Sequence, residues 1–403
     1  MVNVIELNGR RYQKPQRPTV IICVDGCDPE YLERGIPDGI FPTISAFQRE
    51  GYLGMADAVV PTFTNPNNVS IVTGAPPSVH GIAGNYYLDR ESGREVMMTD
   101  EGLMRSETIL ALMAQTGVRV AAVTAKDKLR KLLGRNLDGI CFSSECADAE
   151  VEALVGRGRP DMYSADLSLF VLDAGVALLE RGMAQLLYLS LSDYVQHGHA
   201  PGAPEADAFN RAIDDRVRRF VELGAVVGLV ADHGMNDKAR PGGEPNVIFL
   251  EDELNRRFGT GSVRVICPIT DPFVRHHGAL GSFVRVYARG AVDICALMAA
   301  SGELPGVALV LDAATAAQRF ELPLDREGDF IVLGDANTAI GASKIEHDLS
   351  GLAGHRLRSH GGLGEQTVPF ILSKPLTPEY RRIAETRRLR NYDIFDFALN
   401  GVE

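Results

Sequence analysis

Short apolar runs alternate with stretches of helical period along most of the chain. Runs rich in Val, Ile or Leu that end in polar residues predict strands at 19–24, 118–124, 186–191, 226–231 and 368–372. Amphipathic or apolar stretches predict helices at 107–115, 165–181 and 204–223. This alternation is typical of a mostly parallel sheet with helices on both faces, so the predicted fold class is α/β.

The pattern changes between about residues 241 and 345. This stretch opens with RPGGEPN and continues as strand, helix, strand, helix through RVYARGAVDICALMAASG and GVALVLDAATAAQRF. We interpret residues 241–345 as an α+β cap domain inserted into a core made of residues 1–240 and 346–403. The alternative is that the stretch extends the main sheet.

Composition excludes several classes of protein. Of the 403 residues, 45% are hydrophobic, which is enough to fill cores and excludes a disordered or fibrous chain. The net charge of −12 repels nucleic acid and anionic membranes, so an anionic ligand needs a local positive site. No apolar run approaches the roughly 20 residues that span a bilayer, and the N-terminal stretch lacks the apolar centre of a secretory signal. We expect a soluble, cytoplasmic protein without nucleic-acid or membrane partners.

The six cysteines form no CxxC pair, and several lie in apolar runs. We expect buried free thiols, because their spacing suits no zinc site and better ligands lie nearby.

Carboxylate and imidazole groups gather just after predicted strands and near the C-terminus. The segments are VDG with Asp25, LSDYVQHGH with Asp193, His197 and His199, ADHGM with Asp232 and His233, and RSHGG with His360. Each segment alone is a common turn or loop. The carboxyl ends of parallel strands meet at one edge of a sheet, so together these groups predict one pocket. Such a set suits two zinc-like ions, each with about four N or O ligands and one position open to substrate.

Thr64 is the candidate nucleophile. It precedes Asn-Pro-Asn-Asn and an apolar run of helical character, which places it at a predicted helix N-terminus. Free backbone N–H groups and the helix dipole there favour an alkoxide and an incoming phosphoryl oxygen. The alternative is an ordinary threonine N-cap.

Taken together, Asp25, the TFTNPNN segment, SDYVQHGH, ADHGM and SHGG resemble the alkaline phosphatase superfamily, in its phosphodiesterase-like branch. The resemblance covers most of the chain, in the family's order. It implies one metal ion held by Asp193, His197 and His360. It implies a second ion held by Asp25, Asp232 and His233, with Thr64 as nucleophile and ligand facing it. Two Zn²⁺ ions are expected on family grounds, although Asp and His also accept Mn²⁺ or Fe²⁺.

The resemblance also implies residues around the substrate. Asn85 corresponds to an asparagine that contacts phosphoryl oxygens, and His197 and His360 border the same substrate site. His199 receives no ligand role, and neither does His80, so both are expected to be structural.

Lys126 and Lys128 are the candidate residues for substrate choice. They follow the strand predicted over 118–124, at the edge where the ligands gather. Two ammonium groups there would bind an anion with a second negative group, such as a carboxylate. Breaking a carbon–phosphorus bond expels a carbanion, and cations on the adjacent carboxylate stabilise the developing charge. The alternative is that KDKLRK begins a surface helix with solvated lysines.

The activity expected from this set is hydrolysis of the small anionic phosphonate phosphonoacetate to acetate and phosphate. Thr64 would form a covalent phosphothreonine, which water would then hydrolyse. A nucleotide pyrophosphatase or phosphodiesterase is the main alternative, although 7% aromatic residues and no Trp argue against a base-stacking slot. A metal- or phosphate-binding protein without turnover is the alternative outside enzymes. The oligomeric state stays open, with a homodimer as one alternative.

Overall fold

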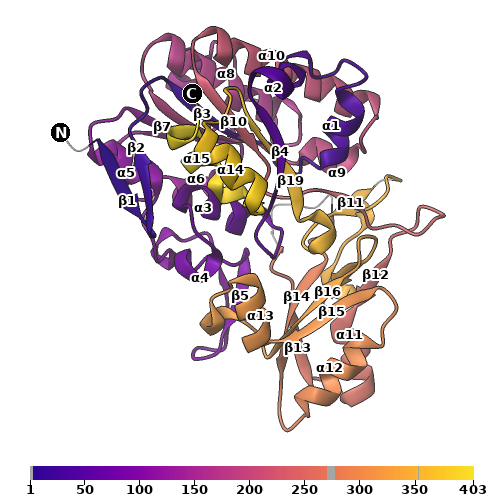
Figure 1. Ribbon diagram of the computed structural model, residues 1–403. Helices are drawn as coiled ribbons and strands as arrows, with labels where there is room; N and C mark the ends of the chain where they lie inside the picture. Colours follow the sequence, from indigo (N-terminus) through magenta and orange to yellow (C-terminus); the bar gives the residue numbers. More distant parts are fainter. Residues whose placement is uncertain (1–2, 270–276, 353) are drawn as a thin grey trace.

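The computed structural model describes residues 3–269, 277–352 and 354–403, and its centre is an eight-stranded sheet (Figure 1). In spatial order its strands are β20 (Leu389–Arg390), β4 (Tyr52–Asp57), β19 (Thr367–Leu372), β10 (Val226–Val230), β3 (Thr19–Cys23), β9 (Leu186–Ser190), β7 (Val120–Thr124) and β8 (Ile140–Ser143). The five strands predicted from sequence are all present, each within two residues of the predicted bounds. The strands β4, β8 and β20 were not predicted.

The sheet is mostly parallel, as predicted. From β10 to β8 the neighbours run parallel, whereas β19 lies antiparallel to both β10 and β4. Every residue of β3, β7, β9 and β10 is buried, which explains their uninterrupted apolar sequences.

Helices cover both faces of this sheet. They are α1 (Pro29–Gly35), α2 (Pro42–Glu50), α3 (Thr64–Thr73), α4 (Pro77–His80), α5 (Ile109–Gln115), α6 (Asp127–Leu133), α7 (Ala149–Val155), α8 (Asp166–Glu180), α9 (Tyr194–Gly198), α10 (Pro204–Glu222), α14 (Pro378–Thr386) and α15 (Ile394–Asn400). The helices α2, α8 and α10 pack together over one face, and α3, α5 and α15 gather over the other (Figure 1). The predicted α/β architecture is confirmed.

A second sheet of four strands lies in the lower part of Figure 1. Its strands are β13 (Val263–Ile266), β14 (Phe283–Ala288), β16 (Phe330–Gly334) and β15 (Val307–Asp312), and its helices are α11 (Leu250–Phe258), α12 (Ile294–Gly302) and α13 (Ala313–Phe320). The sheet has a hydrophobic core of its own, which includes Phe63 and Ala83 from the first part of the chain. The definition of 241–345 as a cap domain stays a prediction, and residues 270–276 lie outside the described part of the chain.

Ala83, Tyr86 and strand β5 (Tyr86–Asp89) contact this second sheet. Arg285 on β14 is fully buried, pairs with Glu327 at 2.7 Å, and donates to the carbonyl oxygens of Ala83 at 2.9 Å and Tyr86 at 3.3 Å. Tyr86 begins the hairpin of β5 (Tyr86–Asp89) and β6 (Arg94–Met97), and β5 contacts β13.

Three further pairs of short strands complete the fold. They are β1 (Val4–Leu7) with β2 (Arg10–Gln13), β11 (Asn236–Asp237) with β18 (Arg358–Ser359), and β12 (Val247–Phe249) with β17 (Ala339–Gly341). In the described ranges, no helix combines the length and apolarity needed to cross a bilayer.

All six cysteines are free, but the expectation of burial is only partly correct. Cys23, Cys27 and Cys267 are buried, whereas Cys146 and Cys295 are exposed near helix starts.

Candidate metal and active site

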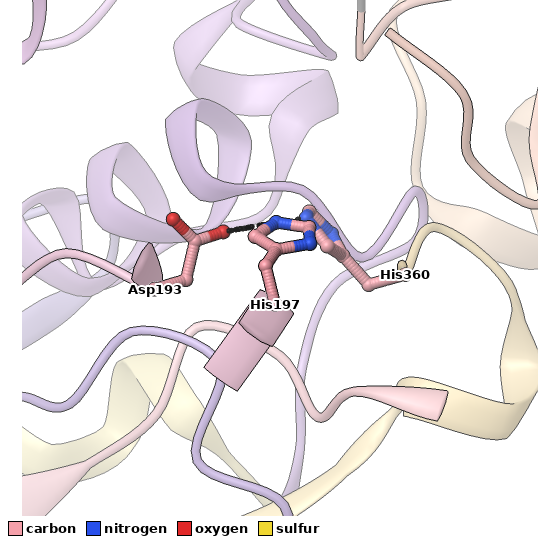
Figure 2. Close-up of side chains that lie close together, drawn as sticks. All are labelled: Asp193, His197 and His360. Carbon is pink, nitrogen blue, oxygen red and sulfur yellow. Dashed lines mark ion pairs between the residues drawn. The ribbon is translucent and has the colours of Figure 1, made fainter. Parts of the chain in front are cut away.

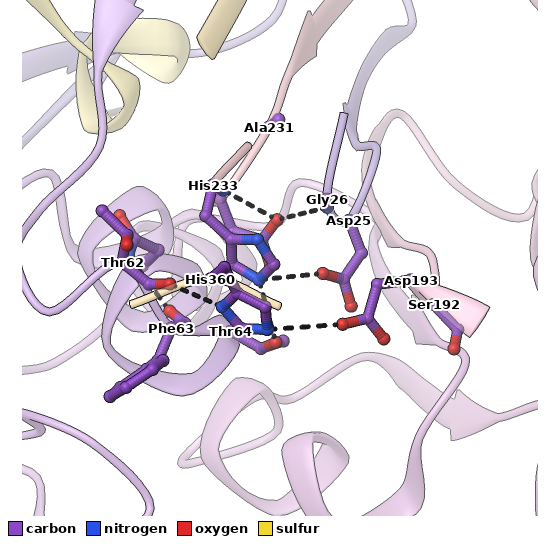
Figure 3. A network of polar contacts seen from close by, with 12 residues as sticks. Asp25, Gly26, Thr62, Phe63, Thr64, Ser192, Asp193, Ala231, His233 and His360 are labelled. Carbon is purple, nitrogen blue, oxygen red and sulfur yellow. Dashed lines mark hydrogen bonds and ion pairs between the residues drawn. The ribbon is translucent and has the colours of Figure 1, made fainter. Parts of the chain in front are cut away.

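The predicted ligands come together at the carboxyl edge of the main sheet (Figure 3). Asp25 follows β3, Asp193 follows β9, and Asp232 and His233 follow β10. These three strands are neighbours in the parallel part of the sheet, so their ends lie side by side. His360 reaches the same place from the segment after β18. All five side chains are almost fully buried.

The first group of side chains is Asp193, His197 and His360 (Figure 2). One potential ligand atom from each lies within 4.8 Å of the other two. Nε2 of His197 is 2.9 Å from Oδ2 of Asp193, and Nε2 of His360 is 3.6 Å from the same oxygen. One carboxylate oxygen facing two imidazole nitrogens is a donor set typical of a divalent transition metal.

The second group is Asp25, Asp193 and His233, again within 4.8 Å of one another. Nε2 of His233 lies 3.2 Å from Oδ1 of Asp25 and 3.8 Å from Oδ2 of Asp232. Asp193 therefore belongs to both groups, and Asp232 lies beside the second.

The histidine rings are oriented by backbone carbonyl groups. Nδ1 of His197 lies 2.7 Å from the carbonyl oxygen of Arg358, and Nδ1 of His360 lies 2.7 Å from that of Thr62. Nδ1 of His233 lies 2.9 Å from its neighbour's carbonyl oxygen. A carbonyl oxygen can only accept a hydrogen bond, so each Nδ1 carries the proton. Each Nε2 then faces the carboxylates and is the ring atom available to a metal ion, which is the arrangement of metal-binding histidines.

The electrostatics of the cluster favour bound cations. Asp25 is fully buried, and neither of its oxygens accepts a hydrogen bond from the described residues. Burial and the charge of Asp25 raise the pKa of Asp232 to about 8. Burial alone would lower the pKa of His233, but the carboxylate of Asp232 raises it to about 9. A buried carboxylate without a donor beside two further buried carboxylates is costly, and divalent ions would remove that cost. The residues present therefore fit the metal ions that the sequence led us to expect.

Thr64 is the first residue of α3, and the helix begins beside the cluster. Its Oγ1 lies 3.4 Å from Nε2 of His233. Phe63 occupies the N-cap position, and no side chain caps the helix. The alternative of an ordinary threonine N-cap is therefore wrong, and the Thr64 hydroxyl faces the ligand cluster.

Lys126 and Lys128 do not extend into solvent like surface lysines. Nζ of Lys126 is 2.8 Å from Oδ1 of Asp193 and 3.7 Å from Oδ2 of Asp25. Burial and the nearby Lys126 ammonium lower the pKa of Lys128 to about 7. An anion bound beside Lys128 would favour its charged form.

The three remaining predicted residues, Asn85, His80 and His199, belong to neither ligand group. Asn85 donates from Nδ2 to the carbonyl oxygen of Ile269 at 3.3 Å, and its buried Oδ1 accepts no hydrogen bond from the described residues. His80 is fully buried and lies 2.8 Å from Oγ of Ser70, and burial lowers its pKa to about 3. His199 is partly exposed and pairs with Glu205 at 3.5 Å.

Asn68 is a residue of the site that sequence reasoning missed. It donates from Nδ2 to Oδ2 of Asp232 at 3.2 Å, and its Oδ1 accepts from the hydroxyl groups of Tyr188 and Ser190. It lies one helical turn after Thr64, on the same side of α3. That spacing is the signal that could have identified it.

This fold and its two buried ligand groups define a class of metal-assisted hydrolase. The family model described as type I phosphodiesterase / nucleotide pyrophosphatase matches residues 19–361. The chain therefore belongs to this family, and the predicted resemblance to the phosphodiesterase-like branch of the alkaline phosphatase superfamily is confirmed.

Within this class the chain is similar, over its whole length, to a phosphonoacetate hydrolase. Two crystal structures of that enzyme from Sinorhizobium meliloti 1021, in complex with phosphonoacetate and with phosphonoformate, share 44% identity with it over 99% of each chain. Their TM-scores are 0.93 and 0.94.

More distant relatives share the fold. Human ectonucleotide pyrophosphatase / phosphodiesterase 5 is 14% identical, with a TM-score of 0.64 over 95% of this chain and 93% of that one. An uncharacterized pyrophosphatase/phosphodiesterase of Schizosaccharomyces pombe is 21% identical over 60% of this chain. The chain spans 48% of that curated relative.

Proposed function

We propose that this protein hydrolyses the carbon–phosphorus bond of phosphonoacetate, releasing acetate and phosphate. The observation that carries the proposal is Lys126 beside the two candidate metal groups, with Lys128 two residues further along in the first turn of α6. Hydrolysis of a phosphate ester needs no second cationic site at this edge, whereas expulsion of a carbanion stabilised by an adjacent carboxylate does. The whole-length similarity to an enzyme crystallised with phosphonoacetate supports the same substrate.

The proposed metal ligands are those that the family resemblance implies. Asp193, His197 and His360 would hold one ion. Asp25, Asp232 and His233 would hold the other, and Nε2 of His233 lies 3.2 Å from Oδ1 of Asp25 and 3.8 Å from Oδ2 of Asp232. Divalent ions bound there, Zn²⁺ in our proposal and Mn²⁺ or Fe²⁺ as alternatives, supply positive charge that lowers the pKa of a hydroxyl group and neutralises phosphoryl oxygens.

In the first chemical step, Oγ1 of Thr64 attacks phosphorus in line with the carbon leaving group. A bond forms between this oxygen and phosphorus as the carbon–phosphorus bond breaks. The electron pair passes to the methylene carbon and is delocalised into the adjacent carboxylate. Lys126 and Lys128 hold that carboxylate and stabilise its developing charge. The hydroxyl proton of Thr64 passes to water, and water gives a proton to the carbon, so that acetate leaves and no net proton is gained or lost.

The second step regenerates the enzyme. Water attacks the phosphorus of phosphothreonine, the bond from phosphorus to Oγ1 breaks, and Thr64 recovers its proton as phosphate leaves. Asn85 contributes by donating to a phosphoryl oxygen in both steps. Its Nδ2 must leave the Ile269 carbonyl oxygen to do so.

A nucleotide pyrophosphatase or phosphodiesterase is the second candidate, because the family model carries that description. The test is a panel of phosphonoacetate, other phosphonates, aryl phosphate esters and a nucleotide diester, with released phosphate or nucleotide as the measurement. We expect phosphonoacetate to have the highest kcat/KM. A higher value for the nucleotide diester would favour the second candidate and overturn the proposal.

A further inference from the structure

Glu365 is a fully buried carboxylate outside both metal groups. It ends the short 3₁₀ helix Leu363–Glu365, which follows the segment that carries His360. Its Oε2 accepts from the backbone N–H of Gly362 at 3.0 Å. One oxygen of Glu365 is thus bound two residues away from a candidate metal ligand.

The other oxygen of Glu365 binds the segment that carries His233. Oε1 accepts from Nδ2 of Asn236 at 2.7 Å and from Nζ of Lys238 at 2.7 Å. The backbone carbonyl oxygen of Glu365 also accepts from the N–H of Gly234 at 2.8 Å. Glu365 therefore binds the segment 234–238, which starts directly after His233.

The two segments are also joined by backbone pairing. β11 (Asn236–Asp237) lies antiparallel to β18 (Arg358–Ser359), with Asn236 opposite Ser359. The pairing of β11 with β18 holds together the two strands next to His233 and His360. Glu365 adds a second connection between the segments that carry these histidines. The two imidazole rings stack, with centroids 3.5 Å apart.

From this arrangement we infer that Glu365, supported by Lys238, is a positioning residue that fixes His233 of one candidate metal group relative to His360 of the other. The inference rests on the metal site of the proposed function. Glu365 acts through the two segments and touches neither ion position. Lys238 is fully buried at the same place, so its ammonium offsets the buried charge of Glu365.

Glu365→Gln is the informative variant, because glutamine keeps the shape but changes the hydrogen bonding. A carboxylate accepts on both oxygens, whereas an amide accepts on one and donates from the other end. Either the N–H of Gly362 or the pair Asn236 and Lys238 must then lose its acceptor. We expect both metal affinities of the variant to fall about tenfold to a hundredfold, the range typical of residues that orient metal ligands.

The matched control is Glu327→Gln, which changes a second fully buried ion pair, with Arg285 at 2.7 Å. Zn²⁺ affinities would be measured by competition with a chromophoric chelator, and folding by thermal melting. We expect the control to bind Zn²⁺ like wild type, even where its Tm falls. Equal loss in both variants, or wild-type affinity in Glu365→Gln, would overturn the inference.

A double variant separates positioning from the cost of an unpaired lysine. Lys238→Met together with Glu365→Gln removes the buried ammonium, so we expect the Tm to recover while metal affinity stays low. Wild-type metal affinity in the double variant would show that the unpaired charge was the cause, and would overturn the inference even where Glu365→Gln alone fails to fold. Wild-type protein that bound no metal would instead contradict the proposed function.

Discussion

Lys126 and Asp193 form an ion pair between a half-buried ammonium and a buried carboxylate, with Nζ 2.8 Å from Oδ1. Because Asp193 belongs to both candidate metal groups, this lysine touches the ligand that the two groups share. Although burial alone would lower the pKa of Lys126, the Asp193 and Asp25 carboxylates raise it, so this lysine stays charged. The two lysines are therefore not equivalent. Lys126 is bound to the cluster, whereas burial and the Lys126 ammonium lower the pKa of Lys128 to about 7.

Replacing Lys128 with Met should damage substrate choice selectively. We expect kcat/KM for phosphonoacetate to fall about a hundredfold to a thousandfold, since one well-placed charge-stabilising contact contributes about 3–4 kcal/mol to a transition state. An aryl phosphate ester has no carboxylate to hold, so its kcat/KM should change less than about tenfold. Parallel steady-state kinetics on the two substrates make the comparison. Equal losses would remove Lys128 from substrate selection.

Replacing Thr64 with Ala should abolish turnover, because the attacking oxygen is lost. Metal content should stay near that of wild type, since the six other candidate ligands remain. Thr64→Ser keeps a hydroxyl group at the start of α3 and should retain measurable activity. Elemental analysis and phosphate release test both variants, and an active alanine variant would contradict the covalent route.

Metal removal should both inactivate and destabilise the protein. Without bound cations, Asp25, Asp193 and Asp232 are three buried carboxylates close together. An ion present at a hundredfold excess over its Kd stabilises the folded state by about 2.7 kcal/mol per site. We expect chelator treatment to lower the Tm by several degrees and Zn²⁺ to restore it. An unchanged Tm in calorimetry would argue against metal binding at these groups.

Asn68→Ala should lower both the stability of the protein and the metal affinity of the group that contains Asp232. The substitution removes the donor to Asp232 and leaves the hydroxyl groups of Tyr188 and Ser190 without their acceptor. Buried groups that lose their partners lower the free energy of unfolding by about 1–3 kcal/mol. Tyr188→Phe removes one of these hydrogen bonds but leaves Asn68 in place, and it serves as the control. Urea unfolding and Zn²⁺ titration should show a stability loss in the alanine variant larger than in the control, with weaker metal binding only in the alanine variant.

The buried parallel strands were predictable because their sequences are uninterrupted apolar runs. β4 and β8 were missed because most of their residues are half-buried, and β20 has only two residues. The antiparallel direction of β19 was not predictable, since an apolar run carries no sign of chain direction.

The candidate site was predictable as a set of residues but not as an arrangement. Parallel strand ends meet at one edge of a sheet, which is why Asp25, Asp193 and Asp232 could be grouped from sequence. The shared position of Asp193 and its pairing with Lys126 depend on the order of the strands and on side-chain directions. Neither is encoded in local spacing.

The buried guanidinium group of Arg285 connects two segments that lie far apart in the sequence. Asn85 comes early in the chain, yet the backbone on either side of it is held by an arginine from β14, far along the sequence. Deleting or exchanging residues 241–345 would thus remove the support of the backbone beside Asn85, a residue that we propose contacts the phosphoryl group. On that proposal the second sheet is structural support for the reaction site and not an interchangeable lid.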